Sequence, residues 1–336
     1  MTDYVSNTTL DQIAARFRDA QRIIITTHVK PDGDALGAVL ALSAALRIEG
    51  KHVEPCVVGP ILPNMQSIVD DADVRVFPAD QPIDPPDADC IVVVDTGAWS
   101  QLEPWHAWLA SRHVRTIVID HHLHGDDVGA TQYIDSRAAA ACEIIAELID
   151  VMNCPFDQSI RDALYMGIAA DTGWFRFSNT RPQTMELAAR LLREGVDHAD
   201  LYRRLDQGER IEKLGLLIRA LDSMHVVNGG NATVMTLRAA DFSETGAQPH
   251  ETERFVDIPQ MVGSVQVVAL LVEQPDGRTR ISLRSKPGPD AVDVNALARR
   301  FGGGGHARAA GAKLDHPIDR ARTLIIDALS ALAETA

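Results

Sequence analysis

Short runs of β-branched residues alternate with longer amphipathic segments through the first half of the chain. Strand-like runs lie at Arg22–His28, His52–Val58, Cys90–Asp95 and Val114–Asp120. Segments with apolar residues at every third or fourth position lie at Gly33–Glu49, Gln101–Ala110, Ala139–Met152, Phe156–Ala170 and Arg181–Glu194. The last two strand-like runs are almost continuously apolar, as expected for central parallel strands covered on both faces. This alternation predicts an α/β domain with a doubly wound, mainly parallel sheet over residues 1–194.

The pattern changes in the second half. Residues 195–222 are helical and charged in character and contain no strand signal, which predicts a connector. Two hairpins, a glycine run and a final helix follow, at His225–Leu237, Val265–Ser285, Gly302–Gly305 and Ile318–Ala333. We therefore expect a smaller α+β domain over residues 223–336.

The length of the chain agrees with a division into two domains, and its net charge limits the classes of binding partner. The chain has 336 residues, more than the roughly 250–300 at which single cores stop growing. Its 32 Lys and Arg against 47 Asp and Glu give a net charge of −15. Such an acidic chain is a poor candidate for binding duplex DNA or an anionic membrane, because both require surplus cations. A short nucleic acid held in a local pocket is compatible with it.

The chain carries no visible targeting signal. The first 22 residues lack a basic start followed by an apolar stretch, and no apolar run approaches the roughly 20 residues that span a bilayer. The four cysteines are scattered and form no CxxC pair. We therefore expect reduced, mostly buried thiols in a cytoplasmic protein.

Four groups of polar residues interrupt the apolar pattern of the first domain, and we place all four where strands end. They are Thr27–Asp34, Asp95-Thr96, Asp120-His121-His122 and, after the helix at 156–170, Asp171-Thr172-Gly173. Ligand sites of open α/β sheets lie beyond the carboxyl ends of the strands. The four groups are therefore expected to converge in space.

Each group alone has a simpler explanation, since an Asp before a helix is commonly its N-cap and a lone His is usually structural. Together, Asp32, Asp34, Asp95 and Asp171 would place four carboxylates in one cleft. At about 5 Å and an effective dielectric of about 20, each pair repels by roughly 3 kcal/mol. Six pairs give about 20 kcal/mol, above the ~5–15 kcal/mol stability of a typical domain. Two divalent cations would balance the four charges, so the sequence predicts a dinuclear metal site.

The types of ligand atom narrow the choice of metal ion. Carboxylates and imidazoles without thiolates suit Mn²⁺ first, with Mg²⁺, Co²⁺ or Fe²⁺ as alternatives. Two such ions polarise a phosphoryl oxygen and activate water, which is the chemistry of phosphate-ester hydrolysis.

The runs HVKPDGD, VVVDT, DHH and GIAADTG resemble the four motifs of the DHH phosphoesterases. The run GGGGH at Gly302–His306 resembles the signature of the DHH-associated C-terminal domain, so the resemblance covers nearly the whole chain. Domain size is similar to the small oligoribonuclease/pAp-phosphatase branch, the NrnA type. RecJ-type exonucleases are longer, and family II pyrophosphatases carry a different second domain without GGGGH.

The resemblance implies a role for each motif residue. His28 and Asp32 would bind one metal ion, and Asp34, His121 and Asp171 the other, with Asp95 bridging both. His122 would face the scissile phosphate as a catalytic residue. Asp120 would support the catalysis by orienting a histidine.

The second domain carries a local basic patch. Consecutive glycines predict a loop whose backbone N–H groups converge on an anion, although a flexible loop beside a solvated strand is the alternative. The resemblance implies that this patch faces the metal cleft, and we expect it to hold the non-reacting end of a nucleotide. The implied substrate-binding residues are Arg284, Ser285, Lys286, Gly303, Gly304, Gly305, His306 and Arg308.

These inferences predict a Mn²⁺-dependent phosphoesterase. As the resemblance implies, it converts 3′-phosphoadenosine 5′-phosphate (pAp) to AMP and phosphate and degrades short RNA oligomers, with linear or cyclic dinucleotides as further substrates. Two alternatives stay open: an inorganic pyrophosphatase or polyphosphatase, and a nucleotide-sensing module that binds without cleaving. Trp99, Trp105 and Trp108 are compatible with a homodimer interface and equally with core packing.

Overall fold

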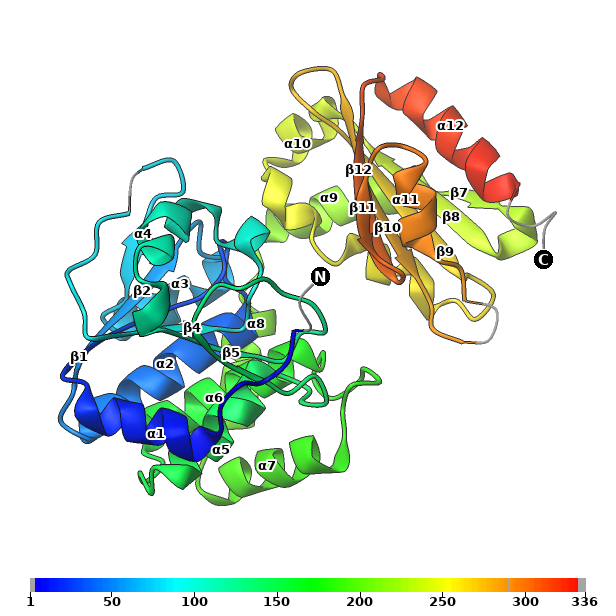
Figure 1. Ribbon diagram of the computed structural model, residues 1–336. Helices are drawn as coiled ribbons and strands as arrows, with labels where there is room; N and C mark the ends of the chain where they lie inside the picture. The colour runs from blue at the N-terminus through cyan, green and yellow to red at the C-terminus, as the bar shows by residue number, and fades with distance from the viewer. Residues whose placement is uncertain (1–3, 82, 289–290, 332–336) are drawn as a thin grey trace. The chain divides into compact units, whose positions relative to one another are not determined.

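The computed structural model describes residues 4–81, 83–288 and 291–331 and divides the chain into two compact units, Met1–Gly208 and Glu209–Ala336 (Figure 1). The division falls inside the segment expected to be a connector, and the proposed limits at residues 194 and 223 remain predictions. No helix among the described residues is long and apolar enough to cross a membrane.

The first unit is built on a six-stranded sheet in which every neighbouring pair is parallel, in the order β3-β2-β1-β4-β5-β6. This order reverses direction between β1 and β4, and such a switch point opens a crevice at the carboxyl ends of the two strands. The strands are β1 (Arg22–Thr26), β2 (His52–Val58), β3 (Arg75–Phe77), β4 (Cys90–Val94), β5 (Thr116–Asp120) and β6 (Thr131–Ile134).

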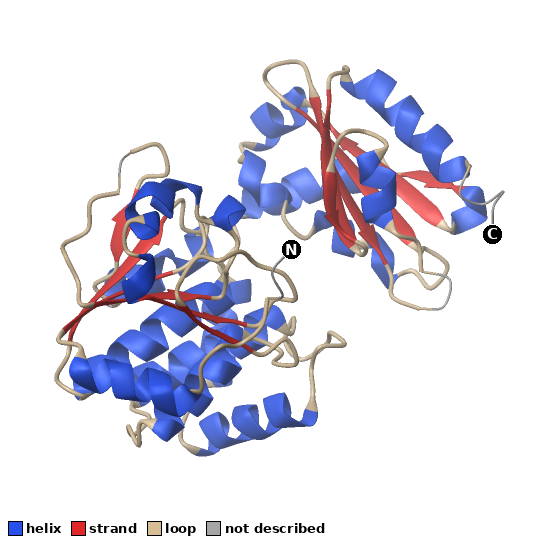
Figure 2. Ribbon diagram, viewed as in Figure 1, coloured by secondary structure: helices blue, strands red, loops and turns tan. Residues whose placement is uncertain are grey.

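Helices cover both faces of this sheet, so its central strands β4 and β5 are buried at every position. One face packs against α1, α2, α5 and α6, and the other against α4 and its preceding turns around the fully buried Trp105 (Figure 2). The helices of the unit are α1 (Leu10–Asp19), α2 (Gly33–Ile48), α3 (Pro63–Asp71), α4 (His106–Ala110), α5 (Ala141–Val151), α6 (Gln158–Asp171), α7 (Pro182–Arg193) and α8 (His198–Asp206).

Glycines allow α2, α5 and α6 to pack unusually closely. A Cβ at Gly37 would lie 2.5 Å from the Ala163 carbonyl oxygen, and one at Gly167 would lie 2.1 Å from Cys142 Sγ. Real Cβ atoms do not approach other atoms this closely, so a larger residue would push the helices apart. The close packing brings the start of α2, the start of α5 and the end of α6 together.

The second unit contains a mixed six-stranded sheet in the order β11-β12-β10-β9-β8-β7, antiparallel except for β8 and β9. Helices α11 and α12 cover one face, and α9 with short 3₁₀ turns covers part of the other. The elements are α9 (Ile211–Asp222), β7 (His225–Val227), β8 (Ala232–Leu237), α10 (Ala239–Thr245), β9 (Val267–Glu273), β10 (Thr279–Ser285), α11 (Val294–Arg299), β11 (Gly304–His306), β12 (Ala309–Leu314) and α12 (Ile318–Ser330).

The predicted α/β class, the parallel sheet and the smaller second sheet are confirmed, and all four cysteines are free and buried. Three local expectations were wrong. Gln101–Ala110 is a pair of 3₁₀ turns followed by the short α4, because Pro104 cannot donate within a longer helix. Asp171 is the last residue of helix α6 and does not follow a strand. Gly304 and Gly305 belong to strand β11 and do not form a loop.

Candidate metal centre

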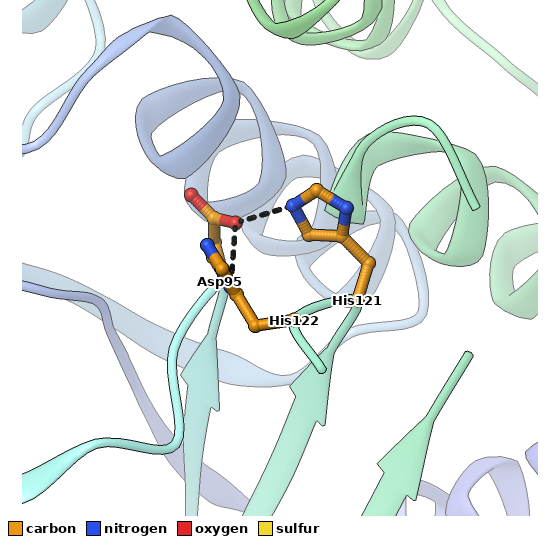
Figure 3. Close-up of side chains that lie close together, drawn as sticks. All are labelled: Asp95, His121 and His122. Atoms are coloured by element: carbon orange, nitrogen blue, oxygen red, sulfur yellow. Dashed lines mark ion pairs between the residues drawn. The ribbon is translucent and has the colours of Figure 1, made fainter. Parts of the chain in front are cut away.

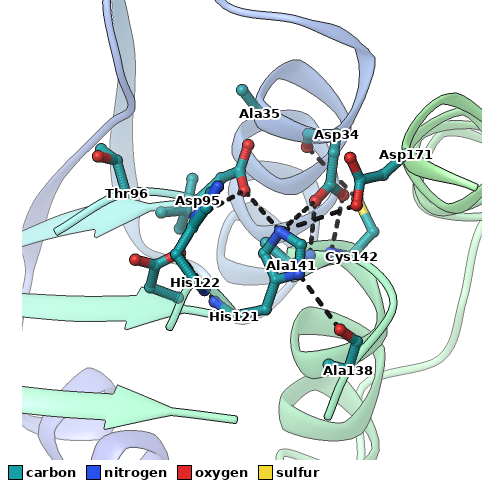
Figure 4. Close-up of polar contacts among 12 residues, drawn as sticks. Asp34, Ala35, Asp95, Thr96, His121, His122, Ala138, Ala141, Cys142 and Asp171 are labelled. Atoms are coloured by element: carbon teal, nitrogen blue, oxygen red, sulfur yellow. Dashed lines mark hydrogen bonds and ion pairs between the residues drawn. The ribbon is translucent and has the colours of Figure 1, made fainter. Parts of the chain in front are cut away.

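The crevice at the switch point of the first sheet collects the polar residues singled out in the sequence. His28 follows β1, and Asp32 and Asp34 lie at the start of α2. Asp95 follows β4, and the Asp120–His122 triplet ends β5. Helix α6 brings Asp171 to the same place, and the side chains of Asp34, Asp95, His121 and Asp171 point toward one another (Figure 4).

Asp95 lies at the centre of this group. Its Oδ1 is 3.3 Å from His121 Nε2, and its Oδ2 is 3.5 Å from His28 Nε2 (Figure 3 shows the His121 side). Its backbone has a φ of 59°, a left-handed conformation that costs roughly 1–3 kcal/mol in a non-glycine residue. The turn stops the strand after Val94 and aims the carboxylate into the crevice, where it is 3% exposed.

His121 joins three carboxylates. Besides Asp95, its Nε2 lies 3.9 Å from Asp34 Oδ2 and 3.9 Å from Asp171 Oδ2. Its Nδ1 lies 3.2 Å from the Ala138 carbonyl oxygen, which fixes the ring so that Nε2 faces the carboxylates.

Backbone N–H groups hold the two carboxylates of α2. The amides of Ala141 and Cys142, at the start of α5, donate to Asp34 Oδ2 at 2.5 Å and Oδ1 at 3.0 Å. Asp32 is the N-cap of α2, with Oδ1 accepting from the amides of Asp34 and Ala35. The same Oδ1 lies 4.0 Å from His28 Nε2, so capping does not remove Asp32 from the cluster.

The geometry of these side chains fits divalent cations. An ion with ligands at about 2.1 Å separates neighbouring donor atoms by about 3.0 Å and opposite ones by about 4.2 Å. The distances given above lie between these limits, and Asp95 Oδ1 is buried without a hydrogen-bond donor. Donor atoms cluster in three groups: His28, Asp32 and Asp95; Asp34, His121 and Asp171; and Asp95, His121 and His122. All six predicted ligands therefore meet, and the assignment of each to one ion stays a prediction.

Without metal, protons hold this cluster together. Burial alone would raise the pKa of Asp95, but the imidazoles of His121 and His28 beside its carboxylate lower it to about 2. Burial lowers the pKa of both histidines, yet the Asp95 carboxylate outweighs it, so that the pKa of His28 rises to about 9 and that of His121 to about 10. Burial raises the pKa of Asp171 to about 6 and that of Asp34 well above its usual value.

We expect metal binding to displace at least two protons at pH 7.5. His28 and His121 are protonated at that pH in the metal-free protein, because their pKa values are about 9 and 10, and only neutral imidazole binds a metal. Affinity for Mn²⁺ should therefore rise by about a hundredfold per pH unit between pH 7 and 8 and less steeply above pH 8, as His28 loses its proton. Titration calorimetry in buffers of different ionisation enthalpy counts the released protons. His28→Ala should release one fewer, and release of less than one proton by the unaltered protein would contradict this picture.

Asp120, the first residue of the DHH triplet, is fully buried and accepts several hydrogen bonds. Its Oδ1 accepts from the amides of His121 and His122 and lies 2.7 Å from His122 Nδ1. Because Nδ1 of His122 is engaged by Asp120, its Nε2 remains available to a bound substrate. The His122 side chain is 43% exposed.

Two supporting residues carry no recognisable sequence signal. Tyr4 Oη donates to Asp120 Oδ2 at 2.6 Å. Its ring occupies space that only glycine leaves open, because a Cβ at Gly97 or Gly125 would lie 1.9 or 2.4 Å from Tyr4 atoms. Asn179 Nδ2 donates at 3.1 Å to the carbonyl oxygen of Asp171, which ties the loop after α6 to the end of that helix.

The substrate residues expected in the second unit lie around one end of its sheet. Arg284 and His306 are both paired with Ala309 of β12, on either side of it, and both are exposed. Ser285 is buried, and its hydroxyl donates to the Val292 carbonyl oxygen at 2.7 Å, as Arg308 does at 2.8 Å. Lys286 donates from its side chain to the Val262 carbonyl oxygen. Gly304 and Gly305 pair with β12, and Gly303 lies close to the same strand.

Two family models match the chain. One, described as the DHH family, N-terminal domain, matches residues 22–168, and the other, the DHHA1 domain, matches residues 229–335.

Relatives and a solved structure match over almost the full length. The chain is 30% identical over 310 residues to a Streptococcus mutans protein named probable bifunctional oligoribonuclease and PAP phosphatase NrnA, covering 91% of this chain and 93% of that protein. It is 30% identical over 312 residues to the Thermus thermophilus bifunctional oligoribonuclease and PAP phosphatase NrnA, covering 91% and 89%. An exopolyphosphatase-related protein from Bacteroides fragilis superimposes with a TM-score of 0.89 at 25% identity, covering 100% of this chain and 99% of that one.

Both family domains occur in the expected order, and the DHH triplet lies among the converging carboxylates and imidazoles. The chain therefore belongs to the DHH family of phosphoesterases and is a metal-dependent hydrolase.

Proposed function

We propose that this protein hydrolyses pAp to AMP and phosphate and degrades short RNA oligomers, using two divalent ions of which Mn²⁺ is the preferred one. The names of the two relatives with 30% identity support these substrates. The proposal for two ions rests on Asp95. Its carboxylate belongs both to the donor group with His28 and Asp32 and to the donor group with His121 and His122, so it can bind an ion on each side. A donor set of oxygen and imidazole nitrogen atoms supports Mn²⁺.

The bound ions would polarise the phosphoryl group and lower the pKa of the attacking water. The chain itself would position and protonate. His121 and the carboxylates around it would hold the ions in the positions where they meet the phosphoryl group, and the buried Asp120 would keep a proton on His122 Nδ1. His122 Nε2 would then donate a proton to the leaving sugar oxygen, or stabilise the charge that develops there. In the second unit, Arg284 and His306 would bind the non-reacting end of the nucleotide.

Product analysis tests this function most directly. The Mn²⁺-loaded protein is incubated separately with pAp, a linear dinucleotide, a cyclic dinucleotide, an RNA pentamer, a long RNA and pyrophosphate. We expect turnover of pAp and the short linear RNAs and much slower turnover of the long RNA and pyrophosphate. Preferential release of phosphate from pyrophosphate or polyphosphate would favour the alternative suggested by the name of the Bacteroides fragilis protein. Binding without turnover of any substrate would indicate a sensor.

We expect Tyr4→Phe to lower kcat by about tenfold, since loss of a residue that supports a site residue typically reduces activity by 10–100-fold. The change removes only the hydroxyl that donates to Asp120. KM and metal content should be unaltered, as measured by steady-state kinetics and metal analysis. If Tyr4 acts through His122, adding Tyr4→Phe to His122→Ala should cause no further loss. Equal losses in both backgrounds would show that Tyr4 acts by another route.

A further inference from the structure

One face of the second sheet carries a strip of cations and very small residues. We define this basic strip by alternate residues of β10 and β12. Their neighbours in the sequence, Ile281 and Leu283 in β10 and Ala312 and Leu314 in β12, pack into the core under α11 and α12. Because side chains alternate along a strand, the strip lies on the opposite face. Its members are Arg280, Ser282, Arg284, Ala309, Gly311 and Lys313.

The strand register arranges the strip in three rows. Arg284 lies across from Ala309, which in turn pairs with His306 of β11. The next row joins Ser282 to Gly311 and Gly304, so it has almost no side-chain bulk. The last row joins Arg280 to Lys313. Rows are two residues apart, so Arg280 lies about 13 Å along the strand from Arg284.

Neither Arg280 nor Lys313 forms an ion pair among the described residues. Like charges directly opposite each other on neighbouring strands are destabilising. Arg280 donates to Thr252 Oγ1 at 2.8 Å and forms no ion pair in the part of the chain that the structure describes, whereas Arg284 at the other end of the strip lies 3.9 Å from Asp257 Oδ1. Burial lowers the pKa of Arg280, with no acidic neighbour offsetting the effect. Lys313 is exposed, and the nearby Asp276 is already paired with Arg278.

We propose that Arg280 and Lys313 bind a backbone phosphate of an RNA oligomer whose end is held at Arg284 and His306. This inference rests on the proposed function. An extended nucleotide unit is about as long as one row spacing, so the phosphate at Arg280 belongs to the second nucleotide beyond the one at Arg284. The Gly311 row between them leaves room for the intervening backbone. Arg280 and Lys313 therefore contribute to binding of trinucleotides and longer oligomers and contribute nothing to pAp or a dinucleotide.

Arg280→Gln and Lys313→Gln test this subsite in the full-length protein. Each should raise KM for an RNA pentamer by about tenfold, because each variant loses one charge-assisted hydrogen bond to a phosphate. KM for pAp and the dinucleotide should stay within twofold. The slope of log KM against log salt for the pentamer should fall by about 0.7 for each phosphate that a variant no longer neutralises. A purely structural effect would change neither the length dependence nor this slope.

Arg238→Gln is the matched control. It also removes one cation from the second unit, but the guanidinium of Arg238 is already paired with Asp319. It should alter no substrate. Arg280 is partly buried, so the stability of Arg280→Gln is checked by thermal unfolding. If that variant is unstable, Lys313→Gln still tests the subsite, because Lys313 is exposed. Equal effects on all substrates, or none on the pentamer, would overturn the subsite. If the unaltered protein hydrolyses neither pAp nor the pentamer, the proposed function itself is wrong.

Discussion

Replacing Asp95 by asparagine is expected to lower kcat/KM by about a thousandfold or more and to remove at least one bound metal ion. The Lewis-acid contribution of a bound metal amounts to several kcal/mol, and about 4 kcal/mol corresponds to a thousandfold. Asp95 has one carboxylate oxygen beside each histidine: Oδ1 lies 3.3 Å from His121 Nε2, and Oδ2 lies 3.5 Å from His28 Nε2. Loss of its charge therefore affects both proposed ions together, whereas loss of a peripheral carboxylate affects one.

Asparagine is the sharper substitution because it preserves the backbone. Asp95 has a φ of 59°, and Asn tolerates this left-handed region better than most residues. Metal analysis and kinetics should be compared with Asp87→Ala, an exposed carboxylate before the same strand that pairs only with Arg115 among the described residues. Asp87→Ala should match the unaltered protein. Activity of Asp95→Asn within tenfold of normal would contradict the two-ion assignment.

The core of the first domain could be predicted because its physical signals are local. β4 is an uninterrupted apolar run, β5 is apolar between Thr116 and Asp120, and β2 has the bounds that its pattern predicts, His52–Val58. The position of the site also followed from the sequence, since residues after parallel strands meet at one edge. Asp95 and the DHH triplet meet in this way, and His28 joins them across the switch point between β1 and β4.

Features set by packing between distant segments could not be predicted. Asp171 was expected in the cluster, but the close packing of α2, α5 and α6 at Gly37 and Gly167 that brings the end of α6 there was not. β11 contains glycines, which disfavour strands, yet a Cβ at Gly305 would lie 2.5 Å from the Ala309 carbonyl oxygen. Glycine is required there by close approach to β12. The short strands β6 and β12 could not be recognised because neither has a β-branched apolar run.

Asp32 shows why single-residue interpretations are weak in both directions. Capping a helix and belonging to a metal cluster are alternatives when the residue is considered alone, and the structure combines them in one carboxylate oxygen. Tyr4 shows the opposite limit. Its role depends on a slot beside Gly97 and Gly125, more than ninety residues away, so no local pattern could reveal it.

His122→Ala is expected to lower kcat by about 10²–10⁴-fold, the usual contribution of a general acid. Metal content should be unchanged, because Nδ1 of His122 is engaged by Asp120 at 2.7 Å and its ring is 43% exposed, whereas the rings of the predicted ligands His28 and His121 are 14% and 13% exposed. Loss of an ion in this variant would instead make His122 a ligand, as its position beside Asp95 and His121 also permits. Steady-state kinetics together with metal analysis separate these two roles.

A change of leaving group then distinguishes proton donation from charge stabilisation. A nucleotide ester of p-nitrophenol releases an anion that needs no proton, whereas a ribose oxygen must be protonated as it departs. If His122 Nε2 supplies that proton, His122→Ala should be severely impaired on RNA and nearly normal on the p-nitrophenyl ester. Equal impairment on both would assign His122 to stabilising the phosphoryl oxygens. Asp120→Asn, which leaves the imidazole in place but weakens the bond at Nδ1, should reproduce the same leaving-group dependence in milder form, because Asp120 acts only through the orientation and charge of His122.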